Sequence, residues 1–321
     1  MAGLVQAVIF VVSLAVVWIF AGILVEAVSR ISRQYCRNGF FTAFFVLGFL
    51  TSISEFSVAI NSSLAGVPSV SAGNLIGASY VILFLIVPLL AIAGGGIALN
   101  QAVSPRSIFI TIAATVLPVL LIVDGDVTRG EGLLALLAYA AVAFTLYRQK
   151  REIAACDIER GDGQRLAPLF ADLGKILAGG IAIFTAAHFL VEEAVYFAGI
   201  LGVPVSLVGL LLLSIGTNVP ELVIAARAVM RGRTDIAFGD YLGSTSMNTF
   251  IFGLLALFSG RFYVAAEEFV MTAALFVVGG IVLFLFAYSR RYISRTEGAF
   301  LLLFYITFVV LQAYAAARIA G

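Results

Sequence analysis

Two glutamates, Glu55 and Glu221, lie near the middle of long apolar stretches of the chain. An ionised carboxylate at the centre of a membrane-spanning helix costs about 2.5–3.5 kcal/mol even on lenient insertion scales. Thr51 and Thr217 each precede one of these glutamates by four residues, which places them one helical turn away on the same face. Carboxylate and hydroxyl oxygens are ligands for hard cations such as Ca²⁺, Na⁺ or Mg²⁺. The spacing therefore predicts a cation site buried in an apolar surrounding.

Further oxygen ligands are expected beside the two threonines. Ser52 and Asn218 follow them on the adjacent helix face. Pro220 has no N–H and clashes with the carbonyl four residues back, so we expect the carbonyl of Gly216 to lose its helical partner and to face a cation. A break in the first segment would rest on Gly48 and on local hydroxyls that compete for backbone hydrogen bonds.

A repeat relates the two glutamate-bearing segments. Shifting the chain by 166 residues places Glu55 on Glu221. The same shift aligns, without a gap, Thr51 with Thr217, Ala59 with Ala225, Gly66 with Gly232, Gly73 with Gly239, and Gly77 with Gly243. Each copy holds five of the membrane spans given below, an odd number, so the second copy is predicted to be inverted relative to the first. Inverted repeats are typical of secondary transporters, whose site lies near the membrane midplane.

Each copy also contains a glycine-rich helix that could pack against the glutamate. These helices begin with GNLIGAS at Gly73 and GDYLGSTSMN at Gly239. Glycines four residues apart let two helix backbones approach closely. We therefore expect this packing to bring four polar residues towards the glutamate-bearing helices: Ser79, Ser244, Thr245 and Asn248.

The composition excludes a water-soluble enzyme. Of 321 residues, 62% are hydrophobic and only 12% are charged, and the mean hydropathy is +1.11; a soluble domain has about 45–50% apolar and 25% charged residues. Because a bilayer core needs about 20 apolar residues of helix, the runs predict an all-α polytopic membrane protein with ten transmembrane helices. The expected spans are 4–28, 39–65, 70–98, 106–123, 130–148, 172–198, 204–229, 236–258, 264–288 and 297–318.

The charges predict an orientation in the membrane. The 19 basic and 18 acidic residues nearly cancel, which argues against a nucleic-acid partner. If the N-terminus is outside, all Lys and Arg residues except Arg129, Arg261 and Arg318 fall on the inner side, and this bias identifies the cytoplasmic face. We expect an integral protein of a prokaryotic cell membrane with both termini extracytoplasmic. The five-helix copies are then 1–148 and 172–321, joined by a cytoplasmic linker at 149–171.

The two repeated segments resemble the alpha repeats of the Ca²⁺:cation antiporter superfamily, which includes the sodium/calcium exchanger family. The second segment, 214–249, carries GTNVPEL from Gly216 to Leu222 and then Gly239, Gly243, Ser244 and Asn248. The first, 48–83, is more degenerate, with LTSISEF from Leu50 to Phe56 and GNLIGAS from Gly73 to Ser79. The expected helix number and inverted repeat extend the resemblance over nearly the whole chain, as in a compact prokaryotic-type member.

The resemblance implies a secondary active antiporter that exchanges Ca²⁺, or a similar divalent cation, for Na⁺ or H⁺ by alternating access. The transported ions are substrates, and neither a cofactor nor an enzymatic activity is implied. The implied ligands are Glu55, Glu221, Thr51, Thr217, Ser52, Asn218, Ser244, Asn248, Gly216, Ser214, Gly48 and Ser79. Ala78 and Ile82 stand where the family has Ser and Asn. Coupling to Na⁺ and coupling to H⁺ both stay open.

Other functions are compatible with parts of the sequence. A cation channel or a non-transporting sensor could use the same scaffold, and flux without a counter-ion, or binding without flux, would identify them. The FGD sequence at 238–240 resembles half of the motif of intramembrane aspartyl proteases, but Asp240 is expected near the inner end of its span and has no mid-helix aspartate partner. The identity of the divalent ion, the direction of transport and the choice between monomer and homo-oligomer stay open.

Overall fold

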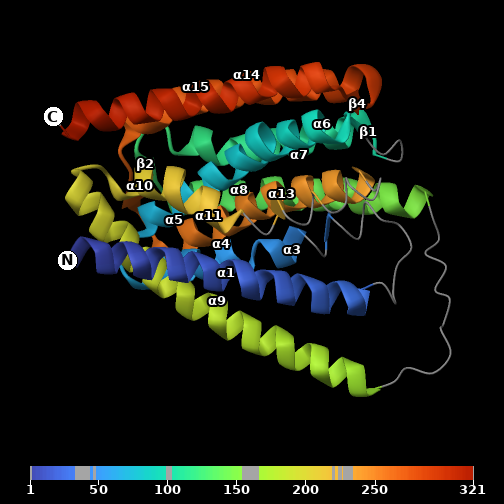
Figure 1. The fold of residues 1–321 in the computed structure, drawn as a ribbon. Helices are drawn as coiled ribbons and strands as arrows, with labels where there is room; N and C mark the ends of the chain where they lie inside the picture. The colour runs from blue at the N-terminus through green and yellow to red at the C-terminus, as the bar shows by residue number, and fades with distance from the viewer. Residues whose placement is uncertain are drawn as a thin grey trace.

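The structure is a computed structural model that describes residues 2–32, 44–45, 48–98, 103–153, 166–218, 221–222, 226 and 234–320. Long helices lie roughly side by side, and both ends of the described chain are at the same end of the molecule (Figure 1). Within these residues, seven helices are long and apolar enough to cross a membrane, and Pro105–Leu121 and Val205–Thr217 are shorter apolar helices. The prediction of a polytopic α-helical membrane protein is confirmed.

The helices of the first half follow the expected spans, with local interruptions. They are α1 (Ala2–Ser32), α3 (Gly48–Thr51), α4 (Ile53–Leu64), α5 (Pro68–Val81), the π-helical η2 (Ile82–Ile86), α6 (Val87–Gly94), α7 (Pro105–Leu121) and α8 (Arg129–Ile153). The second half contains α9 (Leu166–Leu201), α10 (Val205–Val208), the π-helical η3 (Gly209–Leu213), α11 (Ser214–Thr217), α13 (Thr234–Ser259), α14 (Ala266–Arg290) and α15 (Arg295–Ala320).

Two short strand pairs, absent from the sequence prediction, join the two halves. Strand β1 (Ile97–Ala98) pairs antiparallel with β4 (Tyr292–Ile293), and β2 (Asp126–Val127) pairs with β3 (Phe262–Tyr263). The span predicted at 70–98 was therefore too long: its helix ends at Gly94, because Gly95 has a left-handed φ of 82° that a helix C-terminus favours.

An ion pair supports the β2–β3 connection. The Arg261 guanidinium, next to β3, donates from Nε to both carboxylate oxygens of Asp126 in β2 at 2.9 Å. These hydrogen bonds and the positive charge of Arg261 hold the pKa of the Asp126 carboxyl below its usual value.

The last helix of each half begins with the same capping device. At the start of α8, the Thr128 backbone N–H donates to Glu131 Oε2 at 2.7 Å, and the Glu131 N–H donates to Thr128 Oγ1 at 3.4 Å. At the start of α15, the Ser294 N–H donates to Glu297 Oε2 at 2.8 Å, and the Glu297 N–H donates to Ser294 Oγ at 3.3 Å. These reciprocal bonds form capping boxes, which satisfy the free N–H groups of a helix N-terminus.

Helices α5 and α13 form the interior of the molecule. Most of their side chains are buried, whereas the spans in α1, α8 and α15 are largely exposed on the outside of the bundle. Pro118 inside α7 deprives the Ala114 carbonyl of its helical donor. The Thr249 hydroxyl of α13 donates to that carbonyl at 3.0 Å, so the proline break is compensated by a neighbouring helix.

Helices α1 and α9 pack along each other on one flank of the molecule (Figure 1). The rings of Phe10 and Phe197 meet edge to face with centroids 5.7 Å apart. Their apolar side chains form a cluster with Val58, Val70 and Val208, and this cluster is separate from the main apolar core. The α1–α9 pair contacts the rest of the molecule mainly through α4 and α10.

Candidate functional site

The two glutamate-bearing helices are interrupted at equivalent residues. Helix α3 ends at Thr51, and Ser52 has φ −79° and ψ 7° before α4 begins. Helix α11 ends at Thr217, and Asn218 has φ −90° and ψ 5°. Both residues lie in the sparsely populated bridge region of backbone space, which is common at functional sites. Ser52 and Asn218 are also 166 residues apart, so the breaks obey the repeat.

Side chains at both breaks bond to the backbone one turn earlier. Ser52 Oγ donates to the Gly48 carbonyl at 2.8 Å, and Asn218 Nδ2 donates to the Ser214 carbonyl at 2.6 Å. The expectation that Gly48 and a local hydroxyl accompany a break in the first segment is confirmed. Pro220, the expected cause of the second break, lies outside the described residues.

A π-helical stretch precedes each break. Phe44 and Phe45 are π-helical before α3, and η3 spans Gly209–Leu213 before α11. The repeat offset places Phe44 on Leu210, inside η3. Short π-helical segments occur frequently at functional sites because they redirect the side chains that follow.

The glycine-rich helices pack backbone to backbone against these π-helical stretches. A Cβ atom at Gly77 in α5 would lie 2.2 Å from the Leu210 carbonyl oxygen, and one at Gly243 in α13 would lie 2.3 Å from the Phe44 carbonyl oxygen. These two contacts are equivalent under the 166-residue offset. The close approach predicted from the glycine spacing is confirmed in both halves.

Both glutamates are buried and incompletely hydrogen-bonded. Glu55 and Glu221 are each 1% exposed. Ser54 Oγ donates to Glu55 Oε2 at 2.8 Å, but Glu55 Oε1 and Glu221 Oε2 have no hydrogen-bond partner among the described residues. No Lys or Arg occurs among the buried side chains that the structure describes. The pair therefore presents carboxylate oxygens that no basic side chain among the described buried residues neutralises.

Each glutamate lies beside the threonine of the other half. Thr217 is a hydrogen-bonding neighbour of Glu55, and Thr51 is one of Glu221. The sequence placed each threonine one turn before its own glutamate, and the contact with the glutamate of the other half was not predicted. The four residues form one group that crosses between the halves.

Helices α5 and α13 complete this group. Thr51 Oγ1 and Ser244 Oγ of α13 share a hydrogen bond of 2.8 Å. Thr217 Oγ1 donates to Asn74 Oδ1 of α5 at 3.4 Å. A third contact joins the two helices themselves, because Asn248 Nδ2 donates to Ser79 Oγ at 3.2 Å. The expectation that Ser79, Ser244 and Asn248 lie near the glutamate-bearing helices is confirmed for Ser244 by its contact with Thr51. The described contact of Ser79 and Asn248 is with each other, and the role of all three as ligands stays a prediction.

The remaining predicted ligands bond to the backbone in the described arrangement. Ser214 Oγ donates to the Leu210 carbonyl at 2.6 Å. The Ser52 hydroxyl donates in the same way to the Gly48 carbonyl, four residues earlier. The Gly216 carbonyl, expected to be free, accepts from the Asn218 backbone N–H. A Cβ at Gly216 would meet a Leu14 methyl at 2.4 Å, so helix α1 packs directly on this residue. Asn218 Oδ1 has no hydrogen-bond partner among the described residues.

Two buried polar residues were not predicted as part of the site. Asn74 contacts Thr217, and Asp240 is fully buried with both carboxylate oxygens unpartnered among the described residues. The sequence contained a signal for both, because the repeat aligns Asn74 with Asp240. Within the described residues, no group of three or more His, Cys, Asp or Glu side chains could hold a metal ion. A cation here would therefore need neutral oxygens in addition to carboxylates.

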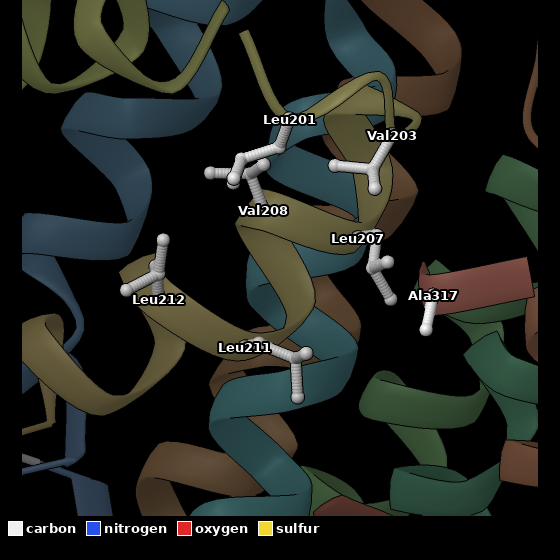
Figure 2. A pocket seen from close by; sticks show the side chains of 7 residues that line it. All are labelled: Leu201, Val203, Leu207, Val208, Leu211, Leu212 and Ala317. Carbon is white, nitrogen blue, oxygen red and sulfur yellow. The ribbon is translucent and has the colours of Figure 1, made fainter. Parts of the chain in front are cut away.

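An apolar pocket lies elsewhere and has different chemistry. It has a volume of about 290 Å³ and is lined by Leu201, Val203, Leu207, Val208, Leu211, Leu212 and Ala317 (Figure 2). Its side chains come from the end of α9, the α10–η3 stretch and α15. No carboxylate, hydroxyl or amide side chain lines it, so it offers no ligand for a cation.

Several known proteins similar to this chain are named as ion exchangers. The family model described as sodium/calcium exchanger protein matches residues 5–148 and 173–314. The sodium/calcium exchanger MaX1 of Methanosarcina acetivorans is 35% identical over 155 residues, which is 47% of this chain and 43% of MaX1.

Two solved structures share the fold. The sodium–calcium exchanger NCX_Mj superposes with a TM-score of 0.68 at 22% identity, covering 96% of this chain and 98% of that one. The H⁺/Ca²⁺ exchanger CAX superposes with a TM-score of 0.74 at 16% identity, covering 98% of this chain and 85% of that one. The family model matches residues 5–148 and 173–314, so both halves of the chain are covered. The chain therefore belongs to the sodium/calcium exchanger protein family.

Proposed function

We propose that the protein is a secondary active antiporter that exchanges Ca²⁺, or a similar divalent cation, for Na⁺ or H⁺. The observation that carries this proposal is the buried pair Glu55 and Glu221, which comes from two equivalent broken helices and has unpartnered oxygens and no buried basic neighbour among the described residues. Two carboxylates balance the charge of one divalent cation, and oxygen ligands suit Ca²⁺ or Mg²⁺. The related exchangers named above support Ca²⁺ as the substrate.

The individual ligands are part of the same proposal. Glu55 and Glu221 would hold the divalent ion from opposite sides, with Thr51 and Thr217 beside them. The neutral oxygens that would complete this site or flanking sites belong to Ser52, Asn218, Ser244, Asn248, Ser79, Ser214, Gly48 and Gly216. Asn218 and Asn248 fit this role best, because each has a buried amide oxygen without a partner among the described residues.

We further propose that the chain consists of two inverted five-helix repeats, 1–148 and 172–321, with ten spans in all. The support comes from features that recur at an offset of 166 residues: the breaks at Ser52 and Asn218, the capping residues Thr128 and Ser294, and the strand pairs, in which β1 corresponds to β3 and β2 to β4. On the charge distribution, both termini are extracytoplasmic and the linker at 149–171 is cytoplasmic.

Exchange rather than leak follows from the charge of the site. With both glutamates ionised and no cation bound, two buried negative charges face each other without compensation, which is strongly unfavourable. The site would therefore change its exposure only when a divalent ion or competing Na⁺ or H⁺ occupies it. The α1–α9 pair, which forms its own apolar cluster, is the element that we propose moves against the remaining helices in alternating access.

Flux measurements test this function. Purified protein in proteoliposomes should take up ⁴⁵Ca²⁺ in response to an opposing Na⁺ or H⁺ gradient, each imposed separately and then repeated with Mg²⁺ as competitor. Glu221→Gln should abolish uptake, because one of the two charges that balance the ion is lost. The matched control is Asp124→Asn, the same change at an exposed acid.

The alternatives give different results. Uptake that is indifferent to both gradients indicates a channel, and Ca²⁺ binding without flux indicates a sensor. Full activity in the Glu221→Gln variant contradicts the proposed site.

A further inference from the structure

The apolar pocket in Figure 2 lies beside the interrupted helix of the second half. It has a volume of about 290 Å³, and all the side chains that line it are apolar. Leu207, Val208, Leu211 and Leu212 come from the stretch that runs from α10 through η3. Helix α11, which ends at Thr217, follows η3 directly. A molecule in this pocket would therefore contact the segment that leads into the candidate site.

The pocket is continuous with the apolar outer surface of the molecule. Two of its lining residues, Leu201 and Leu212, are 51% and 45% exposed. Ile200, which precedes the first, and Ile215, three residues after the second, are also exposed. In an integral membrane protein such a surface contacts lipid hydrocarbon, which is as apolar as a leucine side chain. The pocket therefore opens onto the bilayer.

Neither water nor empty space suits this pocket. Its side chains offer a water molecule no hydrogen-bond partner, and an unfilled space would forfeit dispersion contacts with the walls. Its volume is several times the roughly 30 Å³ that one water molecule takes up in the liquid, and a methylene group is of similar size. A segment of an acyl chain from the surrounding lipid therefore fits the pocket in both chemistry and size.

The position of the pocket selects the part of the chain. Leu201 is the last residue of the candidate span in α9, so the pocket lies near one edge of the hydrocarbon layer. At that depth the part of an acyl chain close to its carboxyl end is present, whereas its methyl end lies toward the middle of the bilayer.

The α10–η3 stretch is fixed on its other face by α5. A Cβ atom at Gly73 of α5 would lie 2.0 Å from the Ser206 carbonyl oxygen, and one at Gly209 of η3 would lie 2.1 Å from the Val70 carbonyl oxygen. Backbone therefore contacts backbone on the α5 side, while larger side chains border the pocket. An acyl chain in the pocket would hold η3 against α5.

The pocket belongs to one half of the repeat. The 166-residue offset places its lining residues on positions of the first half that include two arginines and a threonine, namely Tyr35, Arg37, Phe41, Thr42, Phe45, Val46 and Arg151. A purely apolar lining is thus not a by-product of the internal symmetry. It is specific to the second half.

We propose that this pocket binds an acyl-chain segment of a bilayer lipid, which holds η3 against α5. The occupant comes from the lipid layer at the end of the molecule where α9 ends. This inference goes beyond the proposed ion exchange and does not depend on it.

Photolabelling tests the pocket directly. The purified full chain is reconstituted into vesicles of phosphatidylethanolamine and phosphatidylglycerol that contain a small fraction of phosphatidylcholine with a diazirine near the carboxyl end of one acyl chain. Irradiation releases N₂ and leaves a carbene, which inserts into a nearby C–H bond. Leu207 is only 2% exposed, so the probe should reach it through the pocket. Its labelling should saturate as the probe fraction rises, whereas labelling of Leu285, 52% exposed on α14, should rise in proportion.

Variants that fill the pocket make the test specific. Ala317→Phe adds a ring from α15 and should abolish the saturable labelling of Leu207 while that of Leu285 persists. The matched control is Ala299→Phe, the same change at another exposed position of α15, which should leave both labels unchanged. If Ala317→Phe fails to fold, Leu211→Trp fills the pocket from η3 and should have the same effect.

Unfolding temperatures give a second readout, because a ligand that binds the folded state stabilises it. Adding the same unlabelled phospholipids to delipidated protein in detergent should raise the unfolding temperature of the wild type and of Ala299→Phe. The rise should be smaller for Ala317→Phe, whose pocket is already filled.

Three results would overturn the inference. Labelling of Leu207 that rises in proportion to that of Leu285 would indicate unspecific contact with lipid. Saturable labelling that survives both pocket-filling variants would place the chain elsewhere. Absence of labelling at Leu207 in the wild type would mean that another molecule, such as a second copy of this chain, covers the pocket. None of these measurements requires transport, so a wild type without Ca²⁺ flux would contradict the proposed function and not this site.

Discussion

The contact between α13 and the first broken helix leads to a quantitative prediction for Gly243→Ala. A Cβ atom at residue 243 would lie 2.3 Å from the Phe44 carbonyl oxygen and 2.9 Å from Phe44 Cα, whereas ordinary contacts begin at 3.4 Å. The two backbones would have to separate by roughly 1 Å at this point, because the obstructing atoms belong to the main chain. Overpacking of this kind costs about 1–3 kcal/mol.

The effect on binding should exceed the effect on stability. Ser244 follows Gly243 directly and is 2.8 Å from Thr51, so a displacement of about 1 Å removes that hydrogen bond. Misplacing site groups by about 1 Å can cost about a hundredfold in activity. We expect Ca²⁺ affinity, measured by calorimetry on purified protein, to fall at least tenfold, together with a lower unfolding temperature. Gly77→Ala should behave alike, because its Cβ would lie 2.2 Å from the Leu210 carbonyl oxygen.

A glycine in open space provides the matched control. Gly180 lies inside α9, and nothing lies within 4 Å of a Cβ placed there. Gly180→Ala should leave Ca²⁺ affinity unchanged and raise stability by up to about 1 kcal/mol, through helix propensity. Wild-type affinity in Gly243→Ala, or an equal loss in Gly180→Ala, would refute the reasoning.

Two further predictions concern stability. Thr249→Val keeps the side-chain shape but leaves the Ala114 carbonyl without its donor, so thermal unfolding should show a loss of about 1 kcal/mol; an unchanged unfolding temperature would mean that another group satisfies this carbonyl. Thr128→Ala and Ser294→Ala each remove one capping box and should each cost about 1 kcal/mol. Markedly unequal losses in this pair of variants would contradict the equivalence of the two helix ends.

The sequence was sufficient for the features that depend on local chemistry. Apolar run length predicted the helices, and the burial of Glu55 and Glu221 was predictable because carboxylates are rare inside such runs. The capping boxes could also have been predicted, since TRGE at 128–131 and SRTE at 294–297 carry the Ser/Thr-x-x-Glu pattern. The three glycines at 94–96 also indicated where α6 ends.

The features that were missed depend on contacts between distant segments. The pairing of each threonine with the other half's glutamate needs two breaks and the crossing of two helices, and no spacing within one segment encodes it. The strand pairs are only two residues long, which is too short for an alternating pattern to be visible. Asp240 looked like an interfacial residue because it is near a helix end, and its burial depends on the packing of the neighbouring segments around α13.

The strand pairs have a consequence for the origin of the molecule. Strand β1 of the first half binds β4 of the second, and their counterparts, β3 and β2, bind in the reciprocal way. This reciprocity is the rule for an isologous dimer, in which a patch i on one subunit meets j on its partner while j meets i. Two separate copies of one ancestral half could form both connections at once, and fusion through a linker would require no new contact. Later divergence would then account for equivalent positions that carry different residues, such as Asn74 and Asp240.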